Sequence, residues 1–340
     1  MFTGKNIFIA PLDWGLGHAT RCVPIIKELL KNNQIILGVT PLTKSIFDEE
    51  FPLVKKIELP AYGIQYSAVL PLWMKLAFDY PRIKKITESE RLMLDDLITQ
   101  NKIDVVISDN RFGLYSKKAH CVFITHQLFL KAPVFETFAQ NINKKYVLKF
   151  DEIWVPDYEE SGSSDLSANI KSLSGELSHG KHYHKNVKYI GPKSRLSDVI
   201  CEVEKEKYDY LFLLSGPEPG RTALENELLI KAKKSNKKIA LVRGSRFNPD
   251  SYRNQDSRFE GMDVFDFPKK EELKTLILSS GKIICRSGYS TLMDMHLLGK
   301  KELILIPTPG QSEQEYLAYY WQKYFGTITL SEKNIQSFQL

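Results

Sequence analysis

Residues 6–18 read NIFIAPLDWGLGH, an apolar run followed by a glycine-rich turn. The run 6–10 predicts a buried strand, and residues 18–31 predict a helix with one inward face, because apolar side chains recur there at helical spacing. Gly15 and Gly17 allow a tight turn that larger side chains would block. His18 is therefore expected at a helix start beside the carboxyl end of a strand, where open α/β sheets bind ligands.

The same alternation of apolar runs and helical patterns continues along the whole chain. Further strands are predicted at 34–39, 103–107, 121–124, 151–156, 208–214, 238–242, 282–285 and 302–306. Further helices are predicted at 221–234, 269–279, 290–298 and 313–324. Alternating strands and helices are typical of an α/β fold in which parallel sheets are covered on both faces.

The length of 340 residues favours two domains. A Pro/Gly turn at Gly191-Pro192 and the charged stretch after it interrupt the alternating pattern. We predict an N-terminal Rossmann-like domain over 1–190, a linker over 191–207 and a C-terminal domain over 208–340. The last helix is a candidate for packing back on the N-terminal domain.

Two segments break the alternation. Residues 158–185 are rich in Ser, Gly, Asn and Lys and predict a long, mobile loop. Residues 61–86 carry aromatic side chains, including Trp73 and Phe78, close to several lysines. Two interpretations of this second segment stay open: it touches a membrane or a lipid acceptor, or it is a helix packed on the core or lining the cleft.

Composition narrows the function classes. Hydrophobic residues make up 43% and charged residues 26%, so each half can bury a core. The longest apolar stretches are strand-length, short of the roughly 20 residues of a membrane span, and the N-terminus lacks signal-peptide features. We therefore expect a cytoplasmic protein. The net charge of +6 weakly favours anionic partners, but no motif predicts a nucleic-acid partner.

Cysteine and histidine usage argues against metal sites and disulfides. The four cysteines stand far apart without a C-x-x-C pair, so neither a disulfide framework nor a zinc ribbon is expected. His179, His182 and His184 form an H-x-x-H-x-H pattern on a polar segment, but no fourth ligand is evident. Solvated histidines are the simpler interpretation.

The turn that ends in His18 carries the first candidate chemistry. An imidazole titrates near neutral pH, so at a strand end it can accept a proton from a substrate hydroxyl. The positive end of the helix disfavours the protonated ring. Asp13 is close in sequence and is expected to orient the ring. A dinucleotide loop or a plain turn is the alternative, although G-x-G-x-x-G fails because position 20 is Thr, and Arg21 follows.

The second candidate site is the stretch CRSGYSTLMD, residues 285–294, where a strand ends and a helix begins. Backbone N–H groups from Gly288 to Thr291 would point out of that helix end and could cradle a diphosphate. Ser290 adds a hydroxyl donor, and Asp294 can hold both ribose hydroxyls. The alternative is that Ser287 or Ser290 is only a helix cap.

Two further loops follow strands and should lie on the same sheet edge. Ser215 and Gly216 begin a loop whose amides could contact phosphate. Gln314 and Glu315 end another loop and are suited to hydrogen-bonding sugar hydroxyls. Together with residues 287–294, these loops form one predicted cluster.

These motifs resemble those of glycosyltransferase family 28. Gly15-Leu16-Gly17-His18 is similar to the family's glycine-rich turn that ends in His. Residues 286–294 resemble its Arg-Ser-Gly…Glu run, with Asp294 in place of the ribose-binding Glu. Residues 312–316 resemble Asp-x-Gln-Gln-Tyr, which aligns Gln314 with a donor-sugar contact and puts Glu315 where the family has Gln.

Three weaker similarities extend the resemblance over both halves. Residues 191–195 resemble the family's Gly-x-Pro-x-Arg element, which implies that Arg195 lies near the donor phosphates. Thr125-His126-Gln127 is similar to a Glu-Gln-Asn segment, with His126 replacing the acid. Phe265 occupies the place where the family's backbone holds the uracil.

The resemblance implies a GT-B fold, in which two Rossmann-like domains with parallel sheets face each other across a cleft. It implies an inverting transfer from a UDP-sugar or similar nucleotide sugar to an acceptor hydroxyl, with no cofactor and no bound metal. The acceptor is unknown. A lipid-linked acceptor would place the protein at the inner face of the membrane and in cell-envelope glycan or glycolipid synthesis. The implied residues are His18 and Asp13 for catalysis; Gly17, Arg195, Ser215, Gly216, Phe265, Ser287, Gly288, Tyr289, Ser290, Thr291, Asp294, Gln314 and Glu315 for the donor; and Asp109, His126 and Gln127 for the acceptor.

Other functions stay open. A UDP-sugar hydrolase with a similar G-x-G-H-x-x-R turn would use His18 to activate water, and sequence does not separate water from an alcohol acceptor. A nucleotide-sugar epimerase shares the architecture but fits the motifs less well. A non-catalytic nucleotide- or DNA-binding protein would give His18 no role.

Overall fold

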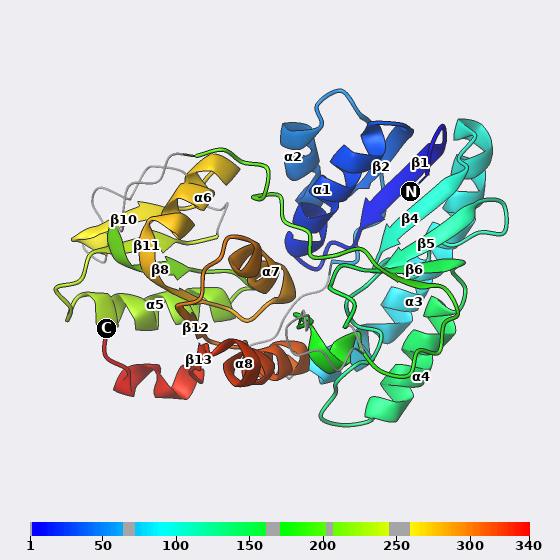
Figure 1. Cartoon of the computed structure of the whole chain (residues 1–340). Coiled ribbons are helices and arrows are strands. Elements are labelled where there is room, and N and C mark those ends of the chain that lie inside the picture. Colours follow the sequence, from blue (N-terminus) through cyan, green and yellow to red (C-terminus); the bar gives the residue numbers. More distant parts are fainter. Residues whose placement is uncertain (1, 64–71, 161–170, 202–206, 245–258) are drawn as a thin grey trace. The chain divides into compact units, whose positions relative to one another are not determined.

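A computed structural model describes residues 2–63, 72–160, 171–201, 207–244 and 259–340. The chain forms two compact units, and the division between them falls between Ser194 and Arg195. Each unit contains one parallel sheet with helices packed on it (Figure 1). The predicted α/β class with two parallel sheets is confirmed.

The sheet of the first unit has seven strands in the order β3-β2-β1-β4-β5-β6-β7. Its strands are β1 (Asn6–Pro11), β2 (Gln34–Val39), β3 (Lys55–Glu58), β4 (Val105–Asp109), β5 (His120–Ile124), β6 (Glu152–Val155) and β7 (Val187–Tyr189). Its helices are α1 (Gly17–Leu30), α2 (Pro41–Glu50), α3 (Leu72–Asn101), α4 (Glu136–Val147) and the 3-10 turn η1 (Gly175–Leu177). Because β1 pairs with both β2 and β4, the strand order reverses there, and the carboxyl ends of β1 and β4 are where such sheets bind ligands.

The sheet of the second unit has six strands in the order β10-β9-β8-β11-β12-β13. Its strands are β8 (Tyr208–Leu213), β9 (Ile239–Val242), β10 (Met262–Phe265), β11 (Ser280–Cys285), β12 (Leu303–Leu305) and β13 (Ile328–Thr329). Its helices are α5 (Gly220–Ala232), α6 (Lys270–Leu278), α7 (Tyr289–Leu297), α8 (Ser312–Phe325) and the 3-10 helix η4 (Glu332–Ser337). The order reverses between β8 and β11, which pair directly.

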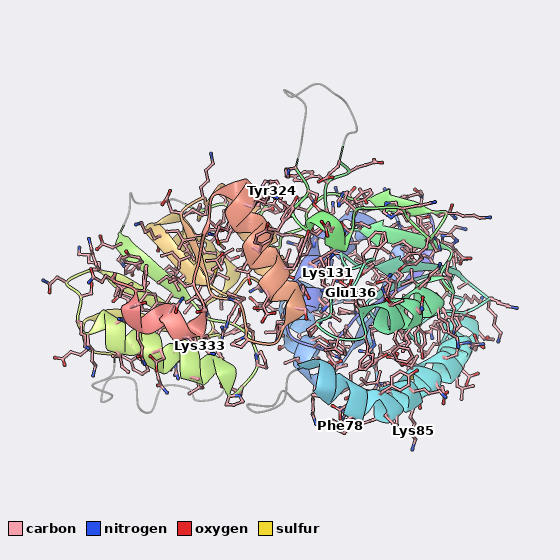
Figure 2. The ribbon with its side chains drawn as sticks, turned by 90° about the horizontal axis from the view of Figure 1, so that it is seen from below. Phe78, Lys85, Lys131, Glu136, Tyr324 and Lys333 are labelled. Atoms are coloured by element: carbon pink, nitrogen blue, oxygen red, sulfur yellow. The ribbon has the colours of Figure 1, made fainter. Side chains whose placement is uncertain are left out.

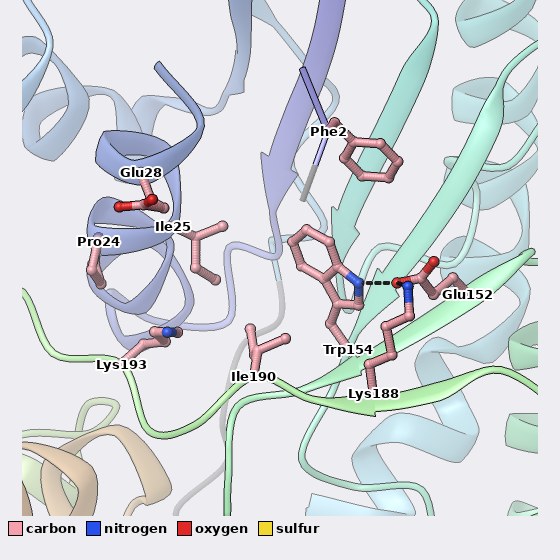
Figure 3. Close-up of a pocket in the computed structure, with 9 residues that line it drawn as sticks. All are labelled: Phe2, Pro24, Ile25, Glu28, Glu152, Trp154, Lys188, Ile190 and Lys193. Atoms are coloured by element: carbon pink, nitrogen blue, oxygen red, sulfur yellow. Dashed lines mark hydrogen bonds and ion pairs between the residues drawn. The ribbon is translucent and has the colours of Figure 1, made fainter. Parts of the chain in front are cut away.

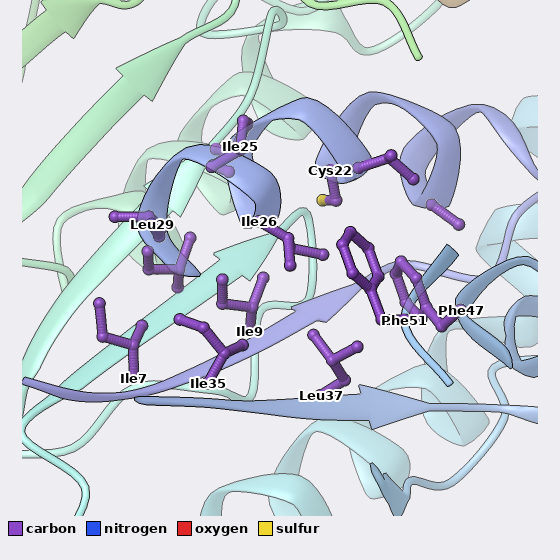
Figure 4. Close-up of a cluster of buried hydrophobic side chains, with 14 of the residues drawn as sticks. Ile7, Ile9, Cys22, Ile25, Ile26, Leu29, Ile35, Leu37, Phe47 and Phe51 are labelled. Carbon is purple, nitrogen blue, oxygen red and sulfur yellow. The ribbon is translucent and has the colours of Figure 1, made fainter. Parts of the chain in front are cut away.

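The core of the first unit fixes α1 on the sheet. Cys22 and Ile26 of α1 are fully buried against Ile7 and Ile9 of β1, as Figure 4 shows. Each such aliphatic side chain contributes on the order of 1.5–3 kcal/mol by leaving water. Since the whole inward face of α1 is committed to this core, the first turn of α1 is held rigidly at the end of β1.

One predicted loop is more ordered than its composition suggests. Ser174 and Leu177, within the predicted mobile loop 158–185, are fully buried. The carboxylate of Asp157 accepts the backbone N–H groups of Leu173 and Ser174, both at 2.8 Å. A buried carboxylate therefore organises this part of the segment, and the prediction of a mobile loop is wrong for it; residues 161–170 lie outside the described part.

The aromatic segment 61–86 is helical from Leu72 onward, as the start of α3. Residues 64–71 and the side chain of Trp73 lie outside the described part of the chain. Farther along α3, Glu90 and Leu94 are fully buried, whereas Phe78 is 70% exposed. The helix thus packs on the core through its later turns. Among the described helices, none combines the length and apolar character needed to cross a membrane.

Candidate active site

His18 and Asp109 meet at the switch point of the first sheet. His18 is the second residue of α1, and Asp109 is the last residue of β4, opposite Pro11 in the β1–β4 register. The His18 Nδ1 atom lies 2.8 Å from Asp109 Oδ1. The same Nδ1 also lies 2.9 Å from Arg21 Nη2. In the tautomer with the ring proton on Nδ1, the ring donates to the carboxylate, which only accepts, and Nε2 keeps its lone pair. The His18 side chain is 18% exposed and the Asp109 side chain is fully buried.

Arg21 holds the same carboxylate from one turn farther along α1. Its Nε donates to Asp109 Oδ2 at 2.6 Å, and its Nη2 donates to Asp109 Oδ1. Burial opposes ionisation of Asp109, but the charges of Arg21 and then His18 outweigh it and hold the pKa of Asp109 well below its usual range. Burial also raises the pKa of the Cys22 thiol, which lies 3.4 Å from Asp109 Oδ2, so Cys22 remains a thiol.

Asp13 does not orient the His18 ring, and that prediction is wrong. The Asp13 carboxylate accepts the backbone N–H of Tyr62 at 3.2 Å and lies 3.8 Å from Arg111 Nη1. The reason lies in the backbone: the N–H of Leu12 still bonds to the carbonyl of Asp109 at 2.8 Å, which extends the β1–β4 ladder. Asp13 then begins a turn directed toward the segment that contains Tyr62.

His126 joins the same buried cluster. Arg21 Nη1 lies 2.9 Å from His126 Nδ1, and since the guanidinium only donates, Nδ1 accepts. Gln127, the next residue, is half-buried and held through its backbone, with its N–H on Thr125 Oγ1 at 3.0 Å. The structure therefore brings Asp109 and His126 together around Arg21. The sequence pattern contained Arg21, but it was not predicted as a site residue.

The predicted diphosphate cradle lies at the start of α7. Gly288 caps this nine-residue helix with an extended backbone, and a Cβ built on it would meet nothing within 4 Å. The first helical hydrogen bond runs from Leu292 N–H to the Gly288 carbonyl, so the preceding amides are outside the ladder. Tyr289 is buried, and Ser290, Thr291 and Asp294 are half-buried in the first turns. The helix start thus leaves space beside Gly288.

The side chains of Gln314 and Glu315 fold back on their own loop. Gln314 Oε1 accepts the N–H of Thr308 at 2.9 Å, and Glu315 Oε1 accepts the N–H of Gly310 at 3.0 Å. Ser287 Oγ donates to the Gln314 carbonyl at 2.7 Å and joins this loop to the start of α7. In this structure both predicted sugar-contacting side chains therefore brace the loop.

Arg286, the first residue of the Arg-Ser-Gly run, connects the loops at the carboxyl edge of the second sheet. It is buried, and Nη1 donates to the carbonyls of Ile306 and Pro307, both at 3.2 Å. Its Nη2 reaches the Gly220 carbonyl at 3.3 Å and Glu332 Oε1 at 2.6 Å. Burial lowers the pKa of Arg286, and Glu332 opposes that change. One guanidinium thus connects the ends of β11 and β12 with the start of α5.

The remaining predicted donor residues lie on the second sheet's carboxyl edge or next to a unit boundary. Gly216 has φ +103, and its Cβ would lie 4.0 Å from Thr308 Oγ1, so the loops after β8 and β12 are adjacent. Ser215 precedes it and is half-buried. Phe265 ends β10, and its carbonyl accepts the Arg243 N–H at 2.8 Å. Arg195 is buried at the start of the second unit.

Gly17, the other predicted donor residue, is the first residue of α1, and its carbonyl accepts a hydrogen bond from Thr20 Oγ1 at 3.0 Å.

Among the described residues, no group of His, Cys, Asp and Glu side chains is arranged to hold a metal ion. The Nε2 atoms of the three histidines of the H-x-x-H-x-H pattern have different partners: the Tyr158 carbonyl for His179, the Tyr189 hydroxyl for His182 and the Phe150 carbonyl for His184.

A separate pocket of about 250 Å³ lies beside the second half of α1 (Figure 3). Its lining residues are Phe2, Pro24, Ile25, Glu28, Glu152, Trp154, Lys188, Ile190 and Lys193. Its charges are largely paired, since Glu152 accepts Trp154 Nε1 and lies 2.8 Å from Lys188 Nζ. No predicted site residue lines this pocket.

Sequence comparisons show similarity to glycosyltransferases. Residues 220–340 match the model of the glycosyltransferase family 28 C-terminal domain. An uncharacterized glycosyltransferase of Methanosarcina mazei is 25% identical over 331 residues, which covers 88% of this chain and 79% of that protein.

Solved structures share the fold over both units. UGT89C1 of Arabidopsis thaliana, complexed with UDP-L-rhamnose, has a TM-score of 0.65 at 12% identity and covers 97% of this chain and 86% of its own. UGT2 of Phytolacca americana, complexed with UDP-2fluoro-glucose and pterostilbene, has a TM-score of 0.62 at 15% identity. The match covers 98% of this chain and 87% of the UGT2 chain.

Proposed function

We propose that this chain, a glycosyltransferase of the GT-B fold similar to family 28, moves a sugar from a UDP-sugar to an acceptor hydroxyl with inversion and without a bound metal ion. The single observation that carries the proposal is the contact between His18 Nδ1 and Asp109 Oδ1 at 2.8 Å. This contact supports the tautomer with the ring proton on Nδ1, in which Nε2 can accept a proton.

The proposed reaction follows from that tautomer. His18 Nε2 takes the proton of the acceptor hydroxyl, and the oxygen attacks the anomeric carbon from the face opposite the UDP. The bond to the sugar C1 forms as the bond to the diphosphate oxygen breaks, so the configuration inverts. Asp109 holds the ring in place and stabilises the charge that develops on it.

The leaving group needs electrostatic support. The open start of α7 at Gly288 offers backbone N–H groups and the positive end of a helix dipole, which favour a diphosphate. We propose that this support takes the place of a metal ion, with the loop at Ser215 and Arg195 assisting. UDP as the nucleotide is supported by the UDP-sugars bound in the two similar plant structures.

The surface around α4 supports a lipid-linked acceptor and peripheral contact with the inner face of the membrane. Phe135 and Phe138 at the start of α4 are 71% and 66% exposed. Lys131 precedes them in the chain, pairs with Glu176 at 2.8 Å, and is labelled next to Glu136 in Figure 2. Exposed phenyl rings beside lysines are suited to an anionic bilayer surface. We therefore propose a cytoplasmic enzyme of cell-envelope glycan or glycolipid synthesis.

The membrane contact is tested by sedimentation with phospholipid vesicles. The double variant Phe135→Ser/Phe138→Ser should lose binding to vesicles that contain an anionic lipid, while Leu53→Ser, a 98% exposed leucine elsewhere on the same unit, should bind as the parent does. Equal sedimentation of all three proteins would contradict this contact.

The catalytic proposal is tested with His18→Ala. We expect transfer to be abolished while UDP binding is retained, because the cradle belongs to the other unit. His120→Ala is the matched control, since His120 begins β5 and its ring faces Asp151 and Glu152. Full transfer by His18→Ala would end the role of His18 as base.

The hydrolase alternative uses the same base on water. A panel of nucleotide sugars, screened first for thermal stabilisation, identifies the donor. Incubation of that donor with the protein and no acceptor then separates the two reactions: free sugar released at the rate of transfer would favour the hydrolase.

A further inference from the structure

Arg21 is the charged group closest to both members of the His18–Asp109 pair. Its guanidinium donates to both Asp109 oxygens, and Nη2 lies 2.9 Å from His18 Nδ1. We propose that Arg21 is a positioning residue that keeps the His18 ring unprotonated, and therefore able to act as a base, down to a lower pH than an Asp–His pair alone would allow. The inference rests on the proposed role of His18 as base.

The argument begins with the charge of the cluster. An isolated buried carboxylate beside a histidine strongly stabilises the protonated ring. Here the Asp109 charge is already neutralised by a guanidinium that is itself buried, so the pair carries no net charge when His18 is neutral. Protonation of His18, whose side chain is 18% exposed, would leave one uncompensated positive charge beside two buried partners, where charges interact more strongly than in water.

The geometry adds a direct repulsion. The His18 Nδ1 proton points at Asp109 Oδ1, and Arg21 Nη2 donates to that same oxygen. In this tautomer Nη2 and Nδ1, which lie 2.9 Å apart, are both donors to that oxygen. A positive charge on the ring would be placed beside the guanidinium, whereas a neutral ring keeps its hydrogen bond to Asp109 at no such cost.

Among the described residues, the polar contacts of the His18 ring are with Asp109 and Arg21, so Asp109 is the one carboxylate that touches the ring. Cys22 of α1 is a buried thiol, and burial raises its pKa. His126, from the segment after β5, accepts from Arg21 through Nδ1. The nearby carboxylate of Asp13 faces the Tyr62 N–H and Arg111. Within the described part of the first unit, the balance between Asp109 and Arg21 therefore sets the proton affinity of His18.

The experiment measures the titration of His18 in the whole protein without substrate. The chain has seven histidines, so the ring carbons are labelled with ¹³C and the His18 signal is assigned with His18→Gln. Arg21→Gln removes the charge, Arg21→Lys keeps it, and Arg91→Gln is the control, because Arg91 pairs with Asp95 on α3.

We expect Arg21→Gln to raise the midpoint of the His18 titration by about one pH unit or more, which is a roughly tenfold gain in proton affinity. The acid limb of kcat/KM should move by the same amount. Arg21→Lys should stay closer to the parent than to Arg21→Gln, and Arg91→Gln should titrate as the parent does. An unchanged midpoint in folded Arg21→Gln, or an equal rise in Arg21→Lys, would overturn the proposal.

Asp109→Asn is a second variant that tests the same effect if Arg21→Gln does not fold. With Arg21 left beside the ring and no carboxylate, the midpoint should fall well below the value of about 6.5 for a free histidine. A midpoint that stays near that value would show that Arg21 exerts no influence and would also overturn the proposal.

The two proposals fail separately. A raised midpoint in Arg21→Gln together with full transfer by His18→Ala would keep the effect of Arg21 and remove the proposed base. An unchanged midpoint together with inactive His18→Ala would keep the base and remove the effect of Arg21.

Discussion

Replacing Asp109 by Asn tests the centre of the first-unit site. Four donors converge on this carboxylate: Arg21 Nε at 2.6 Å, Arg21 Nη2, His18 Nδ1 at 2.8 Å and Cys22 Sγ at 3.4 Å. An amide keeps the shape but removes the charge and turns one acceptor into a donor. The substitution should therefore affect both stability and turnover.

The stability effect comes from Arg21. Removing one partner of a buried ion pair costs about 3–5 kcal/mol, because the other charge is left buried. In a domain of this size each kcal/mol lowers the melting temperature by about 2–4 °C, so the first unit should melt about 6–20 °C lower. A smaller drop in the melting temperature would mean that the Arg21 guanidinium finds another partner.

The turnover effect comes from the His18 tautomer. An amide N–H placed against Nδ1 would force Nδ1 to accept and move the ring proton to Nε2, which then cannot act as base. A wrong tautomer of this kind lowers turnover by on the order of 10⁴-fold in a serine protease, and we expect a loss of similar size here.

The assay is UDP release from the donor identified in the nucleotide-sugar panel, measured well below the melting temperature, with UDP affinity measured in parallel. Asp13→Asn is the matched control: this buried carboxylate is in the same unit, but it accepts from Tyr62 and not from His18. We expect the control to keep its turnover. Folded Asp109→Asn that turns over at the parent rate would refute the tautomer argument.

Three further predictions concern the donor site, the second core and acid stability. Gly288→Ala should keep the melting temperature, because its Cβ meets nothing within 4 Å, but weaken UDP binding by about tenfold or more if the diphosphate lies there; unchanged affinity in calorimetry would contradict the cradle. Gly244→Ala should lower the free energy of unfolding in urea by about 1–3 kcal/mol, because φ is +64 and the Cβ would lie 2.4 Å from the Leu214 carbonyl oxygen; an unchanged midpoint would contradict it. Because the pKa of Asp109 is held well below its usual range, its contribution to stability is present above about pH 4 and is lost as the pH falls toward the folded-state pKa. Asp109→Ala should therefore flatten the fall of the unfolding free energy below pH 4, and an unaltered slope would count against the ion pair.

The local parts of both sites could be predicted from the sequence. The strand–turn–helix units at His18 and Gly288 depend on an apolar run, small residues and a helical pattern, which all lie within a short stretch. Their place on the sheet edge followed from the alternation of strands and helices. The short strands β3, β7, β10 and β13 were not predicted, because none of them is a long continuous apolar run.

The partner of His18 could not be predicted in the same way. Asp109 is 91 residues away along the chain and reaches His18 only because β1 and β4 pair in parallel, with Pro11 opposite Asp109. Sequence proximity favoured Asp13, whose carboxylate is used by the backbone of Tyr62 instead. The contacts of Arg286 could not be predicted for a related reason, since its partners are the carbonyls of Gly220 and Ile306 in other loops.

The spacing of His18 and Arg21 nevertheless contains the missing information. Residues three apart on a helix share one face, so a short turn after β1 directs the imidazole and the guanidinium to the same point. That point is the carboxyl end of the strand that pairs with β1. A buried guanidinium there needs a counter-ion, so H-x-x-R at this helix start requires an acid at the end of the neighbouring strand. Asp109 meets that requirement, and its replacement by Ala, which offers no acceptor, should destabilise the first unit more than Asn does.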